Sequence, residues 1–496
     1  MLNFNLQNTT EMKTTKIYTL ILAAVIGLSG CSKVDDFQDD PNRPVHVGPD
    51  FILPGIEVTA FKNIDAGAAL ASRQLTYING VNAQQYYNWQ RGSFGAYDNI
   101  KQVEKMVEEA EKTGNPVYKT LARFFRSYYF ISLTETFGDI PYSEAVKEGI
   151  SFPKYDDQRS IYKSVLDDLA LANTELSNTT ASIKGDLVYG GDPLKWRKLI
   201  NSYRLRILMD LSKRTDDATL NVRQAFADIV NNPTQNPVME SVNDSGALPF
   251  YNQVNNRYPY FNSNDLKTAY YMEESFVNKL KSYKDPRLFK IAEKKASTEG
   301  TKTEDPFSFY GGLYGSGDLG ANSANASKGL ASRINPRYFD DPVNEPSLLM
   351  GYAELQFVLA EGAFRGWITK DANTYYMKGI TASMNFYKIS DTDAAAYLAQ
   401  PSVQLLSGNG PLEQIMNQKH IALFFNTGWR IFYDQRRTGF PNFNTDGPGV
   451  LNGGKIPKRW MYPSSEITNN NTNLTNAVNK QYPGGDDING AMWLIK

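Results

Sequence analysis

Histidine and cysteine are almost missing from this sequence of 496 residues, which contains two histidines and one cysteine. The histidines, His46 and His420, do not form a pair at the spacing of metal ligands. This scarcity argues against a zinc site or a histidine-ligated iron, because both need several such ligands. The single cysteine also excludes a disulfide within the chain. We therefore expect no metal and no other cofactor.

Strong net charge and familiar catalytic motifs are lacking as well. The formal net charge is -1, which argues against a nucleic acid or a membrane surface as a partner chosen by charge. No Gly-x-Ser-x-Gly elbow is present, and the glycine-rich stretch Tyr310–Gly317 lacks the Gly-Lys-Ser/Thr ending of a phosphate loop. A glycosidase needs only two carboxylates, so a surface glycosidase stays open as an alternative.

The first residues have the pattern of a bacterial lipoprotein signal. Lys13 and Lys16 precede the short apolar run Ile17–Leu28, and Leu28-Ser29-Gly30-Cys31 matches a lipobox. The run is too short for a membrane-spanning helix and has the flanks of a cleaved signal. We predict a signal peptide and lipobox over residues 1–31, with lipidation of Cys31. Residues 32–50, which are rich in proline and aspartate, are expected to form an extended tether.

One long helix is predicted directly after Asn115. Asn115 is a suitable N-cap, and Pro116 fits the first helical position. Gly138 is expected to end the helix in the left-handed conformation, and Pro141 prevents its continuation. The apolar positions repeat at helical spacing and form a wide aromatic face that must be buried: Leu121, Phe124, Phe125, Tyr128, Tyr129 and Leu133.

The segment that follows this helix, Phe137–Ala145 (FGDIPYSEA), resembles the SusD/RagB family of Bacteroidetes surface lipoproteins, in particular its second large subgroup. Asp285–Leu288, Asp434–Pro441 and Ile456–Pro463 are also close to the family pattern. These matches run from the lipobox to about residue 480 in the family's order. We interpret FGDIPY and the Arg436–Arg437 segment as features of the fold, because arginine at a helix end can bind the last carbonyl groups.

The resemblance implies a mostly α fold, in which tetratricopeptide-like helical hairpins form one compact domain. We expect an N-terminal helical part over residues 51–230, including a helical pattern from Pro54 to Asn79. Over residues 231–346, Gly, Asn, Ser, Pro and Tyr dominate, and clear helical periodicity is confined to Glu273–Lys281. This part is predicted to be a loop-rich, mixed insertion that carries the ligand-binding face. Helices should resume at Ser347, in a C-terminal part over residues 347–496.

Two segments combine aromatic rings with amide and arginine side chains, the mixture that a sugar requires. Rings stack on the apolar C–H faces of a sugar, whereas amides and arginines bind its hydroxyl groups. The two segments are Gln84–Arg91 and Asn255–Asn262. Together with the glycine-rich stretch they supply the candidate ligand-binding residues Gln85, Tyr86, Tyr87, Asn88, Trp89, Arg91, Asn256, Tyr258, Tyr260, Tyr310 and Tyr314.

The family resemblance implies a non-enzymatic function. It predicts a lipid-anchored protein at the outer face of the outer membrane, which binds oligosaccharide and hands it to a SusC-like TonB-dependent transporter. No nucleic acid is expected as a partner. Aromatic and amide side chains also bind peptides, so a peptide or another nutrient remains an alternative ligand. A purely structural lipoprotein is a further alternative. The acidic runs Asp486–Asp487 and Asp391–Asp393 do not match an EF-hand calcium loop, and we interpret them as turn-forming acids.

Overall fold

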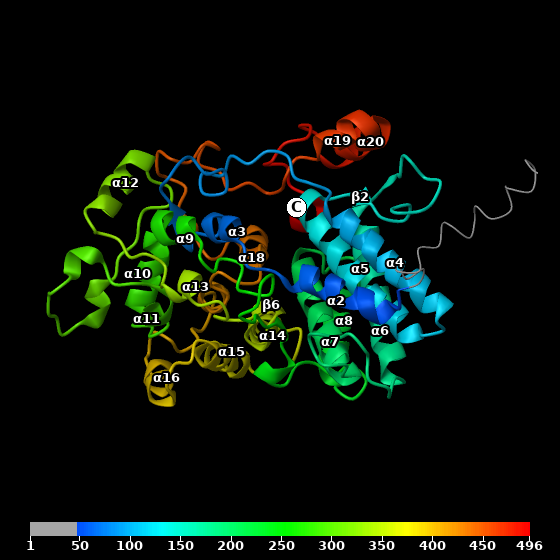
Figure 1. The fold of residues 1–496 in the computed structure, drawn as a ribbon, viewed down its shortest axis with the longest axis horizontal. Coiled ribbons are helices and arrows are strands. Elements are labelled where there is room, and N and C mark those ends of the chain that lie inside the picture. Colours follow the sequence, from blue (N-terminus) through cyan, green and yellow to red (C-terminus); the bar gives the residue numbers. More distant parts are fainter. Residues whose placement is uncertain (1–46) are drawn as a thin grey trace, which may run out of the picture. The chain divides into compact units, whose positions relative to one another are not determined.

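The computed structural model describes residues 47–496, and helices account for most of the regular structure in them (Figure 1). The predicted signal peptide, the lipidation site Cys31 and the tether up to residue 46 lie outside the described residues. Residues Pro49–Lys496 form one compact unit. The finer division at residues 230 and 346 stays a prediction. Within 47–496, no helix combines the length and the apolar character needed to cross a bilayer.

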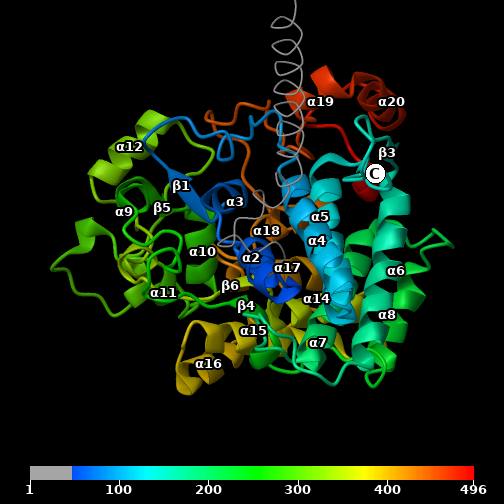
Figure 2. The same cartoon turned by 45° about the vertical axis from the view of Figure 1, so that its right-hand side comes forward.

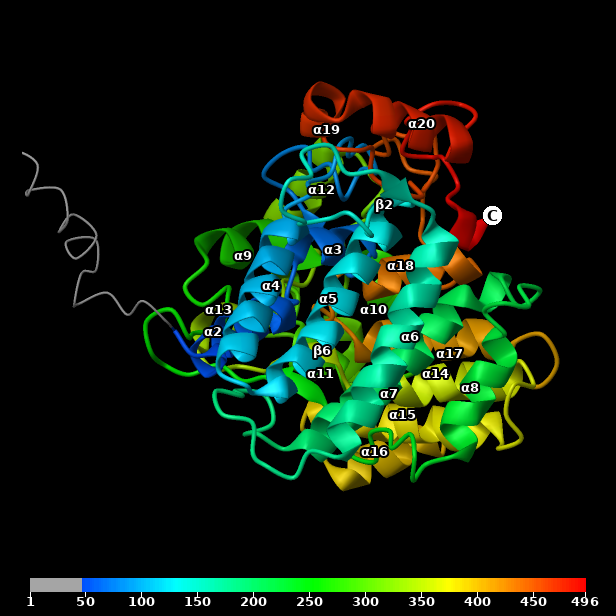
Figure 3. The ribbon, with the colours of Figure 1, turned by 90° about the vertical axis from the view of Figure 1, so that its right-hand side faces the viewer.

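Antiparallel helices form the N-terminal part. From α4 to α8, each helix packs against the next one in the chain, and α2 contacts both α4 and α5. Figure 3 shows α4, α5, α6 and α7 side by side. Hairpins stacked in this way are the arrangement of a tetratricopeptide-like scaffold. The helices are α2 (Pro49–Phe61), α3 (Ala66–Ala71), α4 (Ala96–Lys112), α5 (Pro116–Phe137), α6 (Gln158–Ser177), α7 (Pro193–Asp210) and α8 (Val222–Asn231).

Helix starts in this part follow local capping chemistry. The Asp157 side chain accepts a hydrogen bond from Ser160 N (2.9 Å) at the start of α6. Asp192 accepts one from Leu194 N (2.9 Å) at the start of α7. Such a cap satisfies an N–H group that the helix itself leaves free.

The bounds of α5 are those expected from the sequence. The interactions predicted at its two ends, however, are wrong. Asn115 makes no side-chain capping bond, and Gly138 has φ 95° and ψ −125°, outside the left-handed helical region. A Cβ atom at Gly138 would lie 2.3 Å from both Gln481 Oε1 and Tyr482 Oη. Glycine is therefore needed at this position for the close approach of the C-terminal segment as well as for its positive φ.

Residues 54–79 do not form the continuous helical pattern that the sequence predicted. Helix α2 ends at Phe61, α3 begins at Ala66, and β1 (Leu75–Tyr77) follows. Strand β1 pairs in antiparallel fashion with β5 (Tyr270–Met272), and Tyr77 lies opposite Tyr270 (Figure 2). The strand partner is almost two hundred positions away, so no local periodicity could indicate it.

Residues 231–346 contain more helix than the single segment predicted there. Besides α10 (Glu274–Ser282) there are four further short helices: α9 (Asn264–Ala269), α11 (Leu288–Ile291), α12 (Leu319–Ser327) and α13 (Arg337–Asp340). Helices of one or two turns are too short to give a clear period. The prediction that helices resume at Ser347 is also wrong, because Ser347–Met350 forms β6. It pairs with β4 (Gly246–Leu248). The remaining small sheet joins β2 (Ile140–Pro141) to β3 (Tyr155–Asp156).

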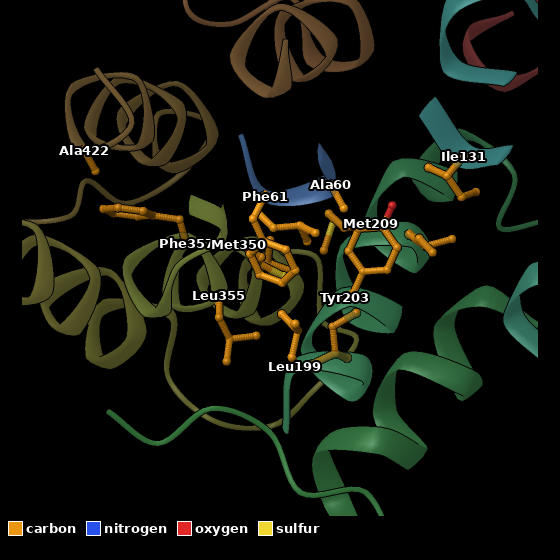
Figure 4. Packing of buried hydrophobic residues seen from close by; sticks show 14 of the residues in the cluster. Ala60, Phe61, Ile131, Leu199, Tyr203, Met209, Met350, Leu355, Phe357 and Ala422 are labelled. Carbon is orange, nitrogen blue, oxygen red and sulfur yellow. The ribbon is translucent and has the colours of Figure 1, made fainter. Parts of the chain in front are cut away.

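The C-terminal helices pack against the N-terminal ones through α14, which contacts α15, α17 and α7. Phe61, Tyr203 and Phe357, from three different helices, lie together in the shared core (Figure 4). The helices of this part are α14 (Tyr352–Phe364), α15 (Ala372–Phe386), α16 (Asp391–Leu398), α17 (Pro411–Ala422), α18 (Arg430–Thr438), α19 (Ser464–Asn469) and α20 (Asn471–Gln481).

A buried network of ionisable side chains joins the two helical parts. We call it the ion-pair network; it consists of Glu135, Arg206, Asp210, Glu354, Glu361, Lys419, Arg430, Asp434 and Arg437, all buried. Asp434 forms an ion pair with Lys419 Nζ (2.7 Å) and accepts a hydrogen bond from Arg437 Nη2 (2.9 Å). Arg430 reaches Asp210 on α7 (2.9 Å). The network therefore connects α5, α7, α14, α17 and α18.

Two of the family-like segments supply buried ion pairs. Arg437 belongs to the segment Asp434–Pro441 and pairs with Glu361 through Nη2 (2.8 Å). Arg287 binds Asp285 (2.6 Å) with both side chains fully buried, and also donates to Gln418 Oε1 (2.8 Å). The first contact joins α18 to α14, and the second joins the segment before α11 to α17.

We expect Asp434→Asn to destabilise the protein strongly. Burial alone would raise the pKa of the Asp434 carboxyl, but Arg430, Lys419 and Arg437 hold it well below its usual range. Removing this charge leaves buried cations without their partner, which costs about 3–5 kcal/mol of unfolding free energy. Chemical unfolding of the purified protein would measure the loss.

Asp167→Asn provides the matched control. Asp167 is exposed on α6 and pairs with Lys163 on the same helix face. An exposed pair of this kind contributes less than about 1 kcal/mol. Equal unfolding midpoints for the two variants would contradict the role given to the ion-pair network.

Candidate ligand-binding site

The first turn of α3 is the point at which the two predicted ligand-binding segments meet. Asp65 caps this helix by accepting from Gly67 N (2.8 Å). Tyr260, from the second segment, accepts a hydrogen bond from Ala66 N at its phenol oxygen (3.0 Å). Gln84, from the first segment, lies against Gly67, where an added Cβ would be 3.4 Å from Gln84 Cγ. Segments far apart in the sequence thus contact the same helix end.

Four half-buried aromatic residues form what we call the aromatic patch: Tyr77, Tyr260, Tyr270 and Trp429. Tyr260 and Trp429 bind this helix end directly, and Tyr270 lies within electrostatic range of Tyr260 and Asp65. The rings of Tyr77 and Tyr270 lie 4.9 Å apart, on adjacent ends of β1 and β5. Trp429 donates its indole N–H to Asp65 Oδ2 (3.2 Å). The patch therefore holds partly exposed rings in fixed positions on short strands and helix ends.

Carboxylates adjoin the phenols of the aromatic patch. Burial and then the nearby Asp265 raise the pKa of both Tyr77 and Tyr270. Burial also raises the pKa of Tyr260, and Asp65 adds to the effect. These phenols therefore stay protonated in the physiological range and are available as hydrogen-bond donors and acceptors. A ligand that offers both hydroxyl groups and apolar faces suits such a surface.

One cavity adjoins the aromatic patch at Trp429, and a second cavity shares Lys62 with the first. One has a volume of about 160 Å³ and is lined by Trp429, Tyr128 and the buried acid Glu135, among others. The other has a similar volume of about 160 Å³ and is lined by Tyr251 and Asn256. Tyr251 and Lys62 are exposed. The exposed site thus extends from Trp429 past Lys62 to the loop around Asn256.

Most residues of the first predicted segment are buried rather than exposed. Gln85, Tyr86, Tyr87 and Trp89 are all at most 4% exposed. Trp89 stacks on Trp460 with centroids 4.8 Å apart and contacts Trp429 edge-on at 5.6 Å. Trp89 thus supports Trp429 from behind. Direct contact of these four residues with a ligand stays a prediction, and it would require them to become accessible.

The other predicted residues are spread over several places. Arg91 pairs with Asp486 (2.9 Å). Tyr258 is buried against Phe250, and Tyr310 is buried beside Phe289. The remaining three are accessible: Asn88 and Tyr314 are half-buried, the latter donating to Asp446, and Asn256 is exposed next to Tyr251. Of the predicted set, the structure brings Tyr260 and Asn256 to the candidate site.

Sequence reasoning missed Tyr77, Tyr270 and Trp429 as candidate site residues. Tyr77 opens the aromatic-rich stretch and could have been included on composition. Tyr270 and Trp429 have no local signal, because the first is a strand residue after a short helix and the second precedes α18. Their role in the patch depends on pairing with distant segments.

His420 and Asp65 are both held by contacts within the protein. No group of three or more His, Cys, Asp or Glu side chains in that range could hold a metal ion. His420 is buried, and its Nε2 hydrogen-bonds the Ser72 carbonyl (2.9 Å). Burial and the neighbouring Lys279 hold the pKa of His420 well below its usual value. Both oxygens of Asp65 are occupied, one by the α3 cap and one by Trp429.

A mostly helical scaffold that presents an aromatic and amide surface defines a class of ligand-binding protein. Comparison with known families places the chain within that class. Residues 56–463 match the sequence profile of a SusD-like family described as "starch-binding associating with outer membrane". The chain therefore belongs to the SusD-like family of outer-membrane nutrient-binding proteins, and its fold is the tetratricopeptide-like one predicted.

Solved structures agree with this assignment. A SusD homologue of Bacteroides fragilis is 40% identical, with a TM-score of 0.85 over 91% of this chain and 100% of that one. An outer-membrane protein of Bacteroides vulgatus, described as probably involved in nutrient binding, is 35% identical, with the same TM-score and coverage. A chitin-binding protein is 25% identical, with a TM-score of 0.75 over 90% of this chain and all of that one. No curated protein matches the sequence.

Glu135, which lines the cavity beside Trp429, gives a pH-dependent prediction. Burial raises the pKa of its carboxyl to about 7, against the opposing effect of Arg430. The folded state then holds a proton that the unfolded chain releases near pH 4.5, so this group's stabilising contribution is lost as the pH rises from about 4.5 through 7. Glu135→Gln should therefore gain stability relative to wild type by about 1–3 kcal/mol between pH 5 and pH 8.

Unfolding curves of both proteins at the two pH values measure this difference. Glu108→Gln, an exposed acid on α4, serves as the control and should show no such change. A Glu135→Gln protein whose stability relative to wild type does not change with pH would contradict the protonated state assigned to Glu135.

Proposed function

We propose that this protein binds oligosaccharide at the aromatic patch and passes it to a TonB-dependent outer-membrane transporter, without bond chemistry. The observation that carries the proposal is the binding of Tyr260 and Trp429 to one helix end, with Tyr270 and its ring neighbour Tyr77 beside them. Partly exposed rings offer stacking surfaces for sugar faces. The description of the family as starch-binding and the likeness to a chitin-binding protein support a glycan as the ligand.

Asp65 is held in a way that favours a positioning role over a role in hydrolysis. A glycosidase needs a carboxyl group free to give or take a proton at the scissile bond. Asp65 is the acid closest to Trp429 through its hydrogen bond, and both of its oxygens already bind the protein. In this proposal the carboxylate fixes the position of the ring.

A glycan-binding screen tests the proposal. Calorimetry of the purified protein against plant, host and microbial glycans should give saturable binding to at least one glycan, with no products in the same samples. Product formation would support a surface glycosidase instead. If no glycan binds and a peptide does, the ligand is a peptide and not an oligosaccharide.

Tyr77→Ala should weaken binding of the identified glycan by about tenfold, because it removes one stacking surface worth about 1–2 kcal/mol. Tyr283→Ala is a matched control, since Tyr283 is a half-buried tyrosine at the end of α10, outside the patch. If Tyr77→Ala binds the glycan with unchanged affinity, the aromatic patch is excluded as the binding site. Trp89→Ala is a poorer test, because loss of a buried indole also costs about 3–5 kcal/mol of stability.

We further propose that a lipid on Cys31 anchors the protein at the cell surface. The lipobox Leu28–Cys31 supports this, and so does the outer-membrane association in the family description. Cys31→Ser should move the protein from the membrane fraction to the soluble fraction, whereas Ser32→Ala should leave it in the membrane. Membrane retention of the Cys31→Ser protein would contradict lipid anchoring.

A further inference from the structure

A cavity of about 470 Å³ lies beside α6 and α7, and none of its lining residues belongs to the candidate ligand-binding site. Two arginines of α7, Arg197 and Arg204, line it. The other lining residues are uncharged: Ala170, Asn173, Thr174 and Ser177 of α6, and Thr234, Gln235 and Asn236 after α8. Apart from Ala170 the lining side chains are polar, and none of them is an acid.

Neither arginine forms an ion pair with any carboxylate in the described part of the chain. Arg197 donates to Asn173 Oδ1 (3.1 Å) and to the Gln235 carbonyl (2.9 Å). Arg204 donates from Nη1 to Asn201 Oδ1 (2.8 Å) and Asn236 Oδ1 (3.0 Å). Amide and carbonyl oxygens carry only partial negative charge, so the two positive charges are not neutralised.

The acidic residues that lie close in sequence to the cavity residues form ion pairs with other basic side chains. Asp168 and Glu175 of α6 both pair with Arg123 on α5 (3.0 and 3.3 Å). Glu240 pairs with Lys198 (2.6 Å). The protein thus supplies no counter-charge to the cavity from these neighbouring acids.

The two guanidinium groups are also partly withdrawn from water. Burial lowers the pKa of Arg204 to about 10 and lowers that of Arg197, and no acid opposes the effect in either case. Arg204 Nε is shielded from solvent and has no hydrogen-bond partner. Desolvated cations without counter-charges are costly, and a bound anion would offset that cost.

We propose that Arg197 and Arg204 form a second binding site, which takes an oxyanion group (a carboxylate, sulfate or phosphate) of a small polar molecule. The planar, forked donors of arginine match the paired oxygens of these groups. Residues Arg197 and Arg204 are seven positions apart on one helix and so project to the same face. The cavity volume exceeds that of a single ion, and the amides and hydroxyls around it can bind the rest of the molecule.

Anion titrations of the purified protein test the site. Sulfate, inorganic phosphate and malonate would be added in HEPES at constant ionic strength maintained with sodium chloride, and binding followed by calorimetry and thermal unfolding. We expect saturable binding of at least one anion. A response to malonate alone would indicate a carboxylate ligand, and a response to sulfate and phosphate would indicate a sulfated or phosphorylated one. The absence of saturable binding by all three would overturn the proposal.

Three substitutions locate the anion. Arg204→Gln and Arg197→Gln should each weaken binding about tenfold, as expected for loss of a charge-assisted hydrogen bond. Arg223→Gln, an exposed arginine of the adjacent α8, should leave binding unchanged. If all three variants bind the anion with the same affinity, the assignment of the site to Arg197 and Arg204 is overturned.

A stability measurement separates binding from a structural role. Without added anion, Arg204→Gln should unfold at the same temperature as wild type or higher, because it removes a desolvated charge. A purely structural arginine would instead lower the unfolding temperature in every buffer, and that outcome would overturn the proposal. If Arg204→Gln does not fold, the more accessible Arg197→Gln gives the same binding test.

Discussion

The buried ion-pair network is the constraint on which the arrangement of the helices depends. Charges are costly to bury, and the cost is recovered only while every partner stays in place. Arg430 therefore needs Asp210 of α7 and Asp434 of its own helix, and Arg437 needs Glu361 of α14. These contacts fix α18 against both helical parts. Trp429 directly precedes Arg430 at the start of α18. The ion pairs that fix α18 therefore also fix the position of Trp429 in the aromatic patch.

Local chemistry made part of the fold predictable. The bounds of α5 followed from Pro116 and Gly138, and the capping bonds of Asp157 and Asp192 at the starts of α6 and α7 involve only residues close in sequence. Strand β6 at Ser347–Met350 was read as helix, because its partner β4 lies about a hundred residues away. The break between α2 and α3 was missed for a similar reason. Its cap, Asp65, is held partly by Trp429 from the far end of the chain.

Composition indicated the region of the candidate site but not the orientation of individual rings. The mixture of aromatic and amide residues led to Tyr260 and Asn256, which lie at the site. The same mixture also drew in Trp89 and Tyr87, which are buried behind Trp429. A ring that supports a surface and a ring that forms it look alike in sequence. Only the packing of distant segments distinguishes them.

The aromatic patch is assembled from residues near the beginning, the middle and the end of the chain, since Tyr77, Tyr270 and Trp429 all contribute. During synthesis, the patch has no complete form until the segment containing Trp429 has emerged and docked. On the proposed function, ligand affinity is consequently a late property of folding. A chain cut short before Trp429 would retain many helices and yet lack a complete aromatic patch.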